Sequence, residues 1–172
     1  MKRAGELMIP LTDYPHIPYW FSLRQAIAML SKSEIEVEGR KSLPRAFLVF
    51  NEAYELLGVV RRRDILRGLG PRALMEPISG GREKLFDVKA DPALFEMSHE
   101  QLAKDIREQS ERPVGEVMLP IKATLSHDDQ LVKIMYEMVQ SDLSLLPVMK
   151  DGGVVGVVRS VDVLEEIAKL VL

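Results

Sequence analysis

Two stretches of the chain place apolar residues three and four positions apart, which is the spacing of a helix with one buried face. These positions are Leu23, Ala26, Ile27 and Leu30 in the first stretch and Leu131, Ile134, Met135 and Met138 in the second. Ser22 can cap the start of the first helix, and Asp128 or Asp129 can cap the second. The pattern therefore predicts two amphipathic helices, one in each half of the chain.

Each predicted helix is followed by two short apolar runs that a turn separates. The runs are 47–50 and 56–60 in the first half and 145–149 and 154–158 in the second. The turn Asp151-Gly152-Gly153 between β-branched residues is a hairpin signal. A closing helix follows each hairpin, and in the second half its predicted apolar stripe is Leu164, Ile167, Ala168 and Val171. The predicted fold class is α+β.

Two pairs of matching segments show that the halves are internal repeats. Residues 5–11 read GELMIPL and residues 115–121 read GEVMLPI. Residues 58–66 read GVVRRRDIL and residues 156–164 read GVVRSVDVL, with six of nine positions identical. We therefore predict repeat one over 5–70 and repeat two over 113–172, packed as one pseudo-symmetric module.

Two regions interrupt this symmetry. Repeat one has extra, charge-rich residues at 33–44, which we interpret as a solvated loop. Residues 71–112 match nothing in the other half, and we interpret them as a linker with short helices that lies on the surface of the repeats. Asp91-Pro92 would open one of these helices, and Ser98 with Gln101 is a capping-box pattern that opens another.

The repeated β-α-β-β-α unit, with its closing G-h-h-x-x-x-D-h-h segment, resembles the cystathionine-β-synthase (CBS) domain, and the pair resembles a Bateman module. The resemblance covers about three quarters of the chain, and repeat two is the closer match. It implies a regulatory module without catalysis of its own, commonly a homodimer. It also implies ligands in the clefts between the repeats, namely AMP, ADP, ATP or S-adenosylmethionine.

The resemblance also implies the site residues. In the family the aspartate of the closing motif holds the ribose hydroxyls, and it corresponds to Asp64 and Asp162 here. A serine or threonine of the family is replaced by Arg61 and Arg159, which cannot accept a capping hydrogen bond. A guanidinium beside a helix N-terminus suits phosphate, although an exposed arginine and a dipole-favoured aspartate are the simpler interpretation. The predicted ligand-binding residues are Asp162, Arg159, Thr124, Ser144, Pro147, Asp64 and Arg61.

Two further features bear on ligand number and assembly. Tyr19, Trp20 and Phe21 correspond to the stretch that borders the adenine in the family. They can stack a base, fill the first cleft or cover a dimer partner, and we favour filling, so we expect at most one ligand per chain, at Asp162. The last helix carries more apolar residues than one buried stripe requires, which favours a homodimer.

Composition excludes several classes of function. The chain has 172 residues, 28% charged, a net charge of −3 and no cysteine. Disulfide frameworks, thiolate zinc sites and cysteine nucleophiles are excluded, and three scattered histidines suggest no metal site. The mildly acidic balance makes nucleic-acid binding improbable. Without an 18-residue apolar run or a signal-like start, we expect no membrane contact and a cytoplasmic location. The alternative function is a ligand-free interaction module that docks on a partner enzyme or transporter.

Overall fold

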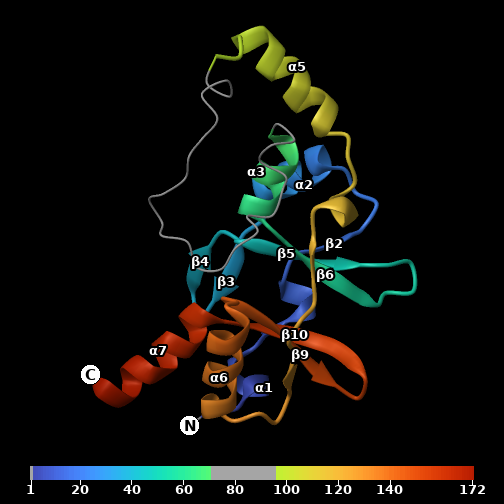
Figure 1. Cartoon of the computed structure of the whole chain (residues 1–172). Coiled ribbons are helices and arrows are strands. Elements are labelled where there is room, and N and C mark those ends of the chain that lie inside the picture. The colour runs from blue at the N-terminus through green and yellow to red at the C-terminus, as the bar shows by residue number, and fades with distance from the viewer. Residues whose placement is uncertain (1, 71–95) are drawn as a thin grey trace.

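The computed structural model describes residues 2–70 and 96–172, and it confirms two α+β repeats (Figure 1). Each repeat contains a four-stranded sheet and a pair of helices. The first sheet has the strand order β2-β5-β6-β7, and the second has the order β1-β10-β9-β8. Repeat one contributes β2 (His16–Pro18), α2 (Leu23–Leu30), β5 (Ala46–Phe50), β6 (Leu56–Arg61) and α3 (Arg62–Leu69).

Repeat two follows the same plan. Its elements are β8 (Leu125–Ser126), α6 (Leu131–Ser141), β9 (Leu145–Lys150), β10 (Gly153–Arg159) and α7 (Ser160–Val171). Asp151 and Gly152, at the turn between β9 and β10, both have positive φ angles, of 50° and 80°. That geometry matches the tight hairpin turns that favour glycine, so the predicted hairpin is confirmed.

The first segment of each repeat is exchanged with the other repeat. Helix α1 (Ala4–Leu7) and strand β1 (Ile9–Pro10) pack on repeat two, where β1 pairs with β10. The short 3-10 helix η3 (Val114–Glu116) and strand β7 (Leu119–Pro120) pack on repeat one, where β7 pairs with β6. The repeats are therefore interlocked.

The glycine that opens each closing motif makes this exchange possible. A Cβ atom on Gly58 would lie 2.5 Å from the carbonyl oxygen of Leu119, and one on Gly156 would lie 2.4 Å from that of Ile9. Any larger residue would push the exchanged strand out of the sheet. This close approach explains why the glycine occurs in both copies of the motif.

Three apolar clusters hold the molecule together. One lies inside each repeat, and the third joins them, with Ile9, Tyr14, Leu48 and Val157 among its buried members. Tyr14 follows the 3-10 turn η1 (Leu11–Asp13), and only 2% of its surface is exposed. The joining cluster makes the two repeats one packed body.

Residues 33–44 are not the solvated loop that their charge suggested. They form a hairpin of β3 (Ile35–Val37) and β4 (Arg40–Ser42), with Glu38 and Gly39 at the turn. Ile35 is 1% exposed and belongs to the cluster that joins the repeats. The prediction of a solvated loop was therefore wrong, because Ile35, between charged residues, is buried in the core.

The helices confirm one capping prediction and correct two other expectations. Ser22 caps α2 by accepting a hydrogen bond from the Gln25 N–H, as predicted. The cap residue of α6 is Gln130, however, while Asp129 accepts from the Ser126 N–H. In α7 the buried positions are Asp162, Val163 and Glu166, whereas Leu164 and Val171 of the predicted stripe are exposed.

The described part of the linker contains helix α5 (His99–Gln109), and Ser98 caps it by accepting from the Gln101 N–H. Leu102 and Ile106 remain more than a third exposed, and the helix buries no residue. The segment after α5 returns to repeat one, where Leu23 N–H donates to the Arg112 carbonyl. A surface helix was expected. The helix predicted at Asp91-Pro92 lies outside the described residues.

Candidate functional site

The carboxylate of Asp64 lies at the N-terminus of α3 and is completely buried. It accepts hydrogen bonds from the backbone N–H and Nε of Arg61, both at 2.9 Å to Oδ2. Its Oδ1 accepts from Nη2 of Arg61 at 3.1 Å and from Nη2 of Arg67 at 2.9 Å. A carboxylate offers about four acceptor positions, so all of them are used.

These bonds also set the ionisation of Asp64. Burial raises the pKa of this carboxyl, but the hydrogen bonds from Arg61 and the charge of Arg67 outweigh burial and hold the pKa below its ordinary value. The same pairing raises the pKa of the Arg61 guanidinium. Asp64 is therefore a paired anion at neutral pH.

Asp162 occupies the equivalent position at the N-terminus of α7, with a different number of partners. It accepts from the backbone N–H of Arg159 at 3.1 Å and from Nε of Arg159 at 2.9 Å, both at Oδ2. Nη2 of Arg159 donates to Oδ1 at 2.6 Å. Among the described residues these are three donors, so one acceptor position of Oδ1 remains.

The residue one turn further along explains the difference. In repeat one it is Arg67, which donates the fourth bond to Asp64. In repeat two the equivalent residue is Glu165, whose carboxylate accepts instead from Arg40 of the β3–β4 hairpin at 2.9 Å. One substitution between the repeats thus decides whether the motif aspartate is saturated.

Arg159 has further contacts that the sequence did not reveal. Its Nη1 donates to the Ser42 hydroxyl of β4 at 3.1 Å, so the hairpin of repeat one reaches the site of repeat two. The buried phenol of Tyr14 interacts electrostatically with Arg159 and Asp162, and burial raises its pKa well above the ordinary value. Its hydroxyl donates to the Ala46 carbonyl at 2.8 Å and is neutral.

The other predicted residues of repeat two lie along β9. Ser144 precedes the strand, and its carbonyl accepts from the Ser160 N–H at 2.8 Å, which places it beside the start of α7. Pro147 is buried in the strand and pairs with Val157. Thr124 is exposed and lies next to the β9–β10 turn, where it lines a hollow of about 400 Å³ with His127, Lys150 and Asp151. Asp162 and Arg159 do not line that hollow.

The aromatic stretch of repeat one divides into two environments. Tyr19 and Phe21 pack against the core of that repeat, and the Tyr19 hydroxyl donates to Glu52 at 2.9 Å. Trp20 is 50% exposed and stands edge-on to Tyr19 with ring centroids 5.3 Å apart. The expectation that all three rings fill a cleft is wrong for Trp20.

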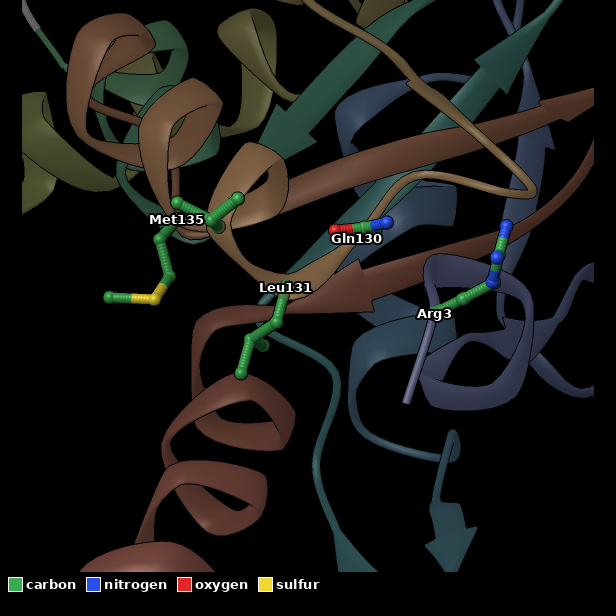
Figure 2. Close-up of a pocket in the computed structure, with 5 residues that line it drawn as sticks. Arg3, Gln130, Leu131 and Met135 are labelled. Carbon is green, nitrogen blue, oxygen red and sulfur yellow. The ribbon is translucent and has the colours of Figure 1, made fainter. Parts of the chain in front are cut away.

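A second surface lies on the helices of repeat two. The start of α6 borders a shallow pocket of about 380 Å³ with Arg3 on its opposite side (Figure 2). Leu131 and Met135 line it (Figure 2). Exposed apolar residues continue along α6 and α7. Those at least 40% exposed are Val132, Met135, Tyr136, Val139, Val161, Leu164, Leu170, Val171 and Leu172.

The described residues contain neither a membrane-spanning helix nor a metal-binding cluster. No helix in residues 2–70 or 96–172 has the length and apolar character needed to cross a membrane. Within the same ranges, no three histidine, aspartate or glutamate side chains gather as a metal-binding group would.

Comparison with known proteins identifies the fold. The sequence model of the CBS domain matches residues 114–169, and no curated protein matches the chain. CBSX2 of Arabidopsis thaliana, solved in complex with AMP, is 17% identical with a TM-score of 0.63, and the match covers 100% of both chains. A CBS domain-containing protein of Kribbella flavida is 17% identical over 98% of this chain and 99% of its own, with a TM-score of 0.68.

A third similar structure is the cytosolic domain of the Mg²⁺ channel MgtE in complex with ATP. It is 20% identical with a TM-score of 0.60, and the match covers 95% of this chain and 48% of that one. At such identities structural likeness establishes fold, and function must be argued from the site. Residues 114–169 thus match the CBS domain model, and the whole chain has the fold of a CBS-domain pair, the Bateman module.

Proposed function

We propose that this chain is a regulatory module that binds an adenine nucleotide or a related phosphorylated ligand at repeat two. The observation that carries the proposal is the pair at the N-terminus of α7. Asp162 keeps one acceptor position, and Arg159 presents a guanidinium beside it, with 17% of its side chain exposed. The AMP and ATP complexes of CBSX2 and MgtE support the choice of ligand class.

The pair offers two complementary functions to such a ligand. Oδ1 of Asp162 can accept one ribose hydroxyl, because a hydroxyl needs a single acceptor position. Nη1 of Arg159 can donate to a phosphate oxygen while Nε and Nη2 stay on Asp162. The N-terminus of α7 adds the partial positive charge that favours anions. A phosphorylated nucleoside therefore fits better than S-adenosylmethionine, which has no phosphate.

The wider proposal concerns assembly and role. We place the protein in the cytoplasm as a homodimer without catalysis of its own, which passes ligand occupancy to a regulated partner. The exposed apolar residues of α6 and α7 support the dimer, because a monomer rarely leaves so many together. Light scattering at micromolar concentration should give twice the 19.4 kDa chain mass, and Val139→Glu with Leu164→Glu should halve it. A wild-type monomer would contradict this part.

Titration calorimetry tests the ligand site directly. AMP, ADP and ATP should bind, and each should raise the melting temperature by mass action. Asp162→Ala should abolish both effects, whereas Arg159→Ala should weaken the nucleotides more than adenosine, because adenosine has no phosphate for the guanidinium. The absence of binding by all three nucleotides at millimolar concentration would refute the proposal.

One observation favours the second candidate, a ligand-free interaction module. Each motif aspartate forms an ion pair with an arginine of its own repeat, so its charge is balanced within that repeat. Under that account the arginines are permanent structural substitutes for a ligand, and the helices of repeat two dock a partner. Unchanged melting temperatures with every nucleotide would leave this candidate standing.

A further inference from the structure

We propose that the β3–β4 hairpin is an internal strap that covers the ligand site of repeat two and must move before the site can be filled. The inference rests on the proposed function and adds to it a means of regulation. Repeat one supplies the strap and repeat two supplies the site, so ligand binding couples the two repeats. Figure 1 shows the hairpin beside the beginning of α7.

The apolar side of the strap anchors it between the repeats. Ile35 is fully buried, and the half-buried Val37 packs against the same cluster. That cluster includes Leu145 and Val157 of β9 and β10, and Leu145 pairs directly with Arg159. The anchor therefore lies against the strands that end at the Arg159–Asp162 pair.

The polar side of the strap contacts the site itself. The Ser42 hydroxyl accepts from Nη1 of Arg159, the one guanidinium nitrogen that Asp162 does not engage. Arg40 pairs with Glu165, one turn along α7 from Asp162. A phosphate that bound Nη1 of Arg159 would approach the nitrogen that the Ser42 hydroxyl already contacts, so we expect strap and ligand to compete for the space beside it.

The strength of these contacts suits a strap that opens. Arg40 is 79% exposed and Glu165 is 41% exposed, and exposed ion pairs are weak. A second ion pair that joins the hairpin to the rest of the chain, Lys2 to Glu38 at 3.8 Å, is also solvent-exposed. Only Ile35 is buried completely among the residues of the two strands. A ligand that gains a charge-assisted bond to Arg159 can displace such contacts.

The site of repeat one shows the closing motif without a strap, because repeat two has no hairpin to supply one. Helix α6 ends at Ser141 and β9 begins at Leu145, so that connection is too short to form a hairpin. The repeat-one pair of Arg61 and Asp64 has no contact from an equivalent strap and is closed instead by Arg67. The two sites thus differ in their additional contact, which is Arg67 on Asp64 in repeat one and the polar side of the strap on Arg159 in repeat two.

A cleavable cross-link tests the strap, because the chain has no native cysteine. Arg40→Cys with Glu165→Cys places one thiol on the strap and one on α7, at a pair in contact. A short bismaleimide with an internal disulfide would fix the strap closed, and reduction would free it. We expect cross-linking to weaken AMP binding at least tenfold and reduction to restore it, because the apparent Kd equals the intrinsic Kd divided by the open fraction.

Single variants test the same point without cross-linking. Arg40→Ala and Ser42→Ala each remove one strap contact at the surface, and each should tighten AMP binding about threefold. Lys41→Ala is the matched control, because Lys41 pairs with Glu34 inside the hairpin and, among the described residues, has no hydrogen bond or ion pair with repeat two. Its AMP affinity should equal that of the wild type.

The outcomes separate the strap from the proposed function. AMP binding that cross-linking leaves unchanged, or weaker binding by Arg40→Ala and Ser42→Ala, would overturn the strap and leave the nucleotide site intact. No AMP binding by any of these proteins, including the reduced double-cysteine variant, would remove the proposed function and the strap with it.

Discussion

The two repeats carry the same closing motif but treat its aspartate differently. Asp64 is completely buried and accepts four hydrogen bonds, two at each carboxylate oxygen. Asp162 is 8% exposed and accepts three among the described residues. The residue three positions later, Arg67 or Glu165, produces this difference. A shared motif therefore does not give two equivalent sites, because a neighbour outside the motif decides what the aspartate can still bind.

The largest effect is expected from adding a methyl group where the repeats exchange strands. Gly58→Ala and Gly156→Ala should each cost several kcal/mol of unfolding free energy, roughly 2–5, because each Cβ would meet a backbone oxygen that belongs to the exchanged strand. Urea unfolding measures this cost.

Gly153→Ala is the matched control for both glycine variants, since its Cβ would meet only the Lys150 carbonyl at 3.9 Å. It should change the unfolding free energy by less than about 0.5 kcal/mol. Similar losses in Gly58→Ala and Gly156→Ala would show that both exchanges matter equally. A loss of stability in only one of the two variants would show that only one of the exchanged strands contributes to the stability of the fold.

The next largest effect is a difference in unfolding free energy between variants of the two motif aspartates. Asp64→Asn should destabilise the chain by about 3 kcal/mol, because it leaves two arginines without their buried anion. Asp162→Asn should cost about half as much, since it leaves only Arg159 without its carboxylate, and Arg159 keeps its hydrogen bond to the Ser42 hydroxyl. Urea unfolding at pH 7 compares them, with Asp13→Asn, an exposed carboxylate, as the control. Equal losses would contradict the difference in pairing.

The lowered pKa of Asp64 determines how the free energy of unfolding changes at acidic pH. The pKa of Asp64 is lower in the folded chain than its ordinary value, so its contribution is complete above about pH 4 and is lost as pH falls through the lowered folded pKa. The stability gap between wild type and Asp64→Asn should stay constant from pH 7 to pH 5 and close below about pH 4. A gap that closes near neutral pH would contradict this assignment.

The smallest effect on the free energy of unfolding is expected at Tyr14, which is buried in the cluster that joins the repeats. Tyr14→Phe removes the hydrogen bond to the Ala46 carbonyl and should cost about 1 kcal/mol. Because the hydroxyl of Tyr14 stays neutral, the loss should not vary between pH 6 and pH 9, which thermal unfolding can follow. Stability equal to that of the wild type would show that this bond does not help to join the repeats.

Local patterns predicted most of the fold. The period of the apolar residues located α2 and α6, the Asp-Gly-Gly turn located the β9–β10 hairpin, and the repeated segments revealed the duplication. These features depend on neighbours in sequence, so one chain is enough to detect them. The exchange of β1 and β7 was missed, because a strand of two residues carries no sign of which sheet it joins.

The residues of the site were predictable only in part. The resemblance put Arg159 and Asp162 in one site, but their ion pair was not predicted, and the three-residue spacings of Arg159 to Asp162 and of Asp64 to Arg67 were the signals that could have revealed both pairs. Ser42 and Tyr14 reach the site from 117 residues away and from a buried turn, respectively. Contacts of that kind follow from packing of the whole molecule, which no local pattern encodes.

The central claim is that repeat two alone binds a ligand, and the stoichiometry of AMP binding tests it most directly. Titration calorimetry of the wild-type chain should give one site per chain, with binding lost in Asp162→Ala and retained in Asp64→Asn. Two equivalent sites per chain, or binding that survives Asp162→Ala but not Asp64→Asn, would contradict the account.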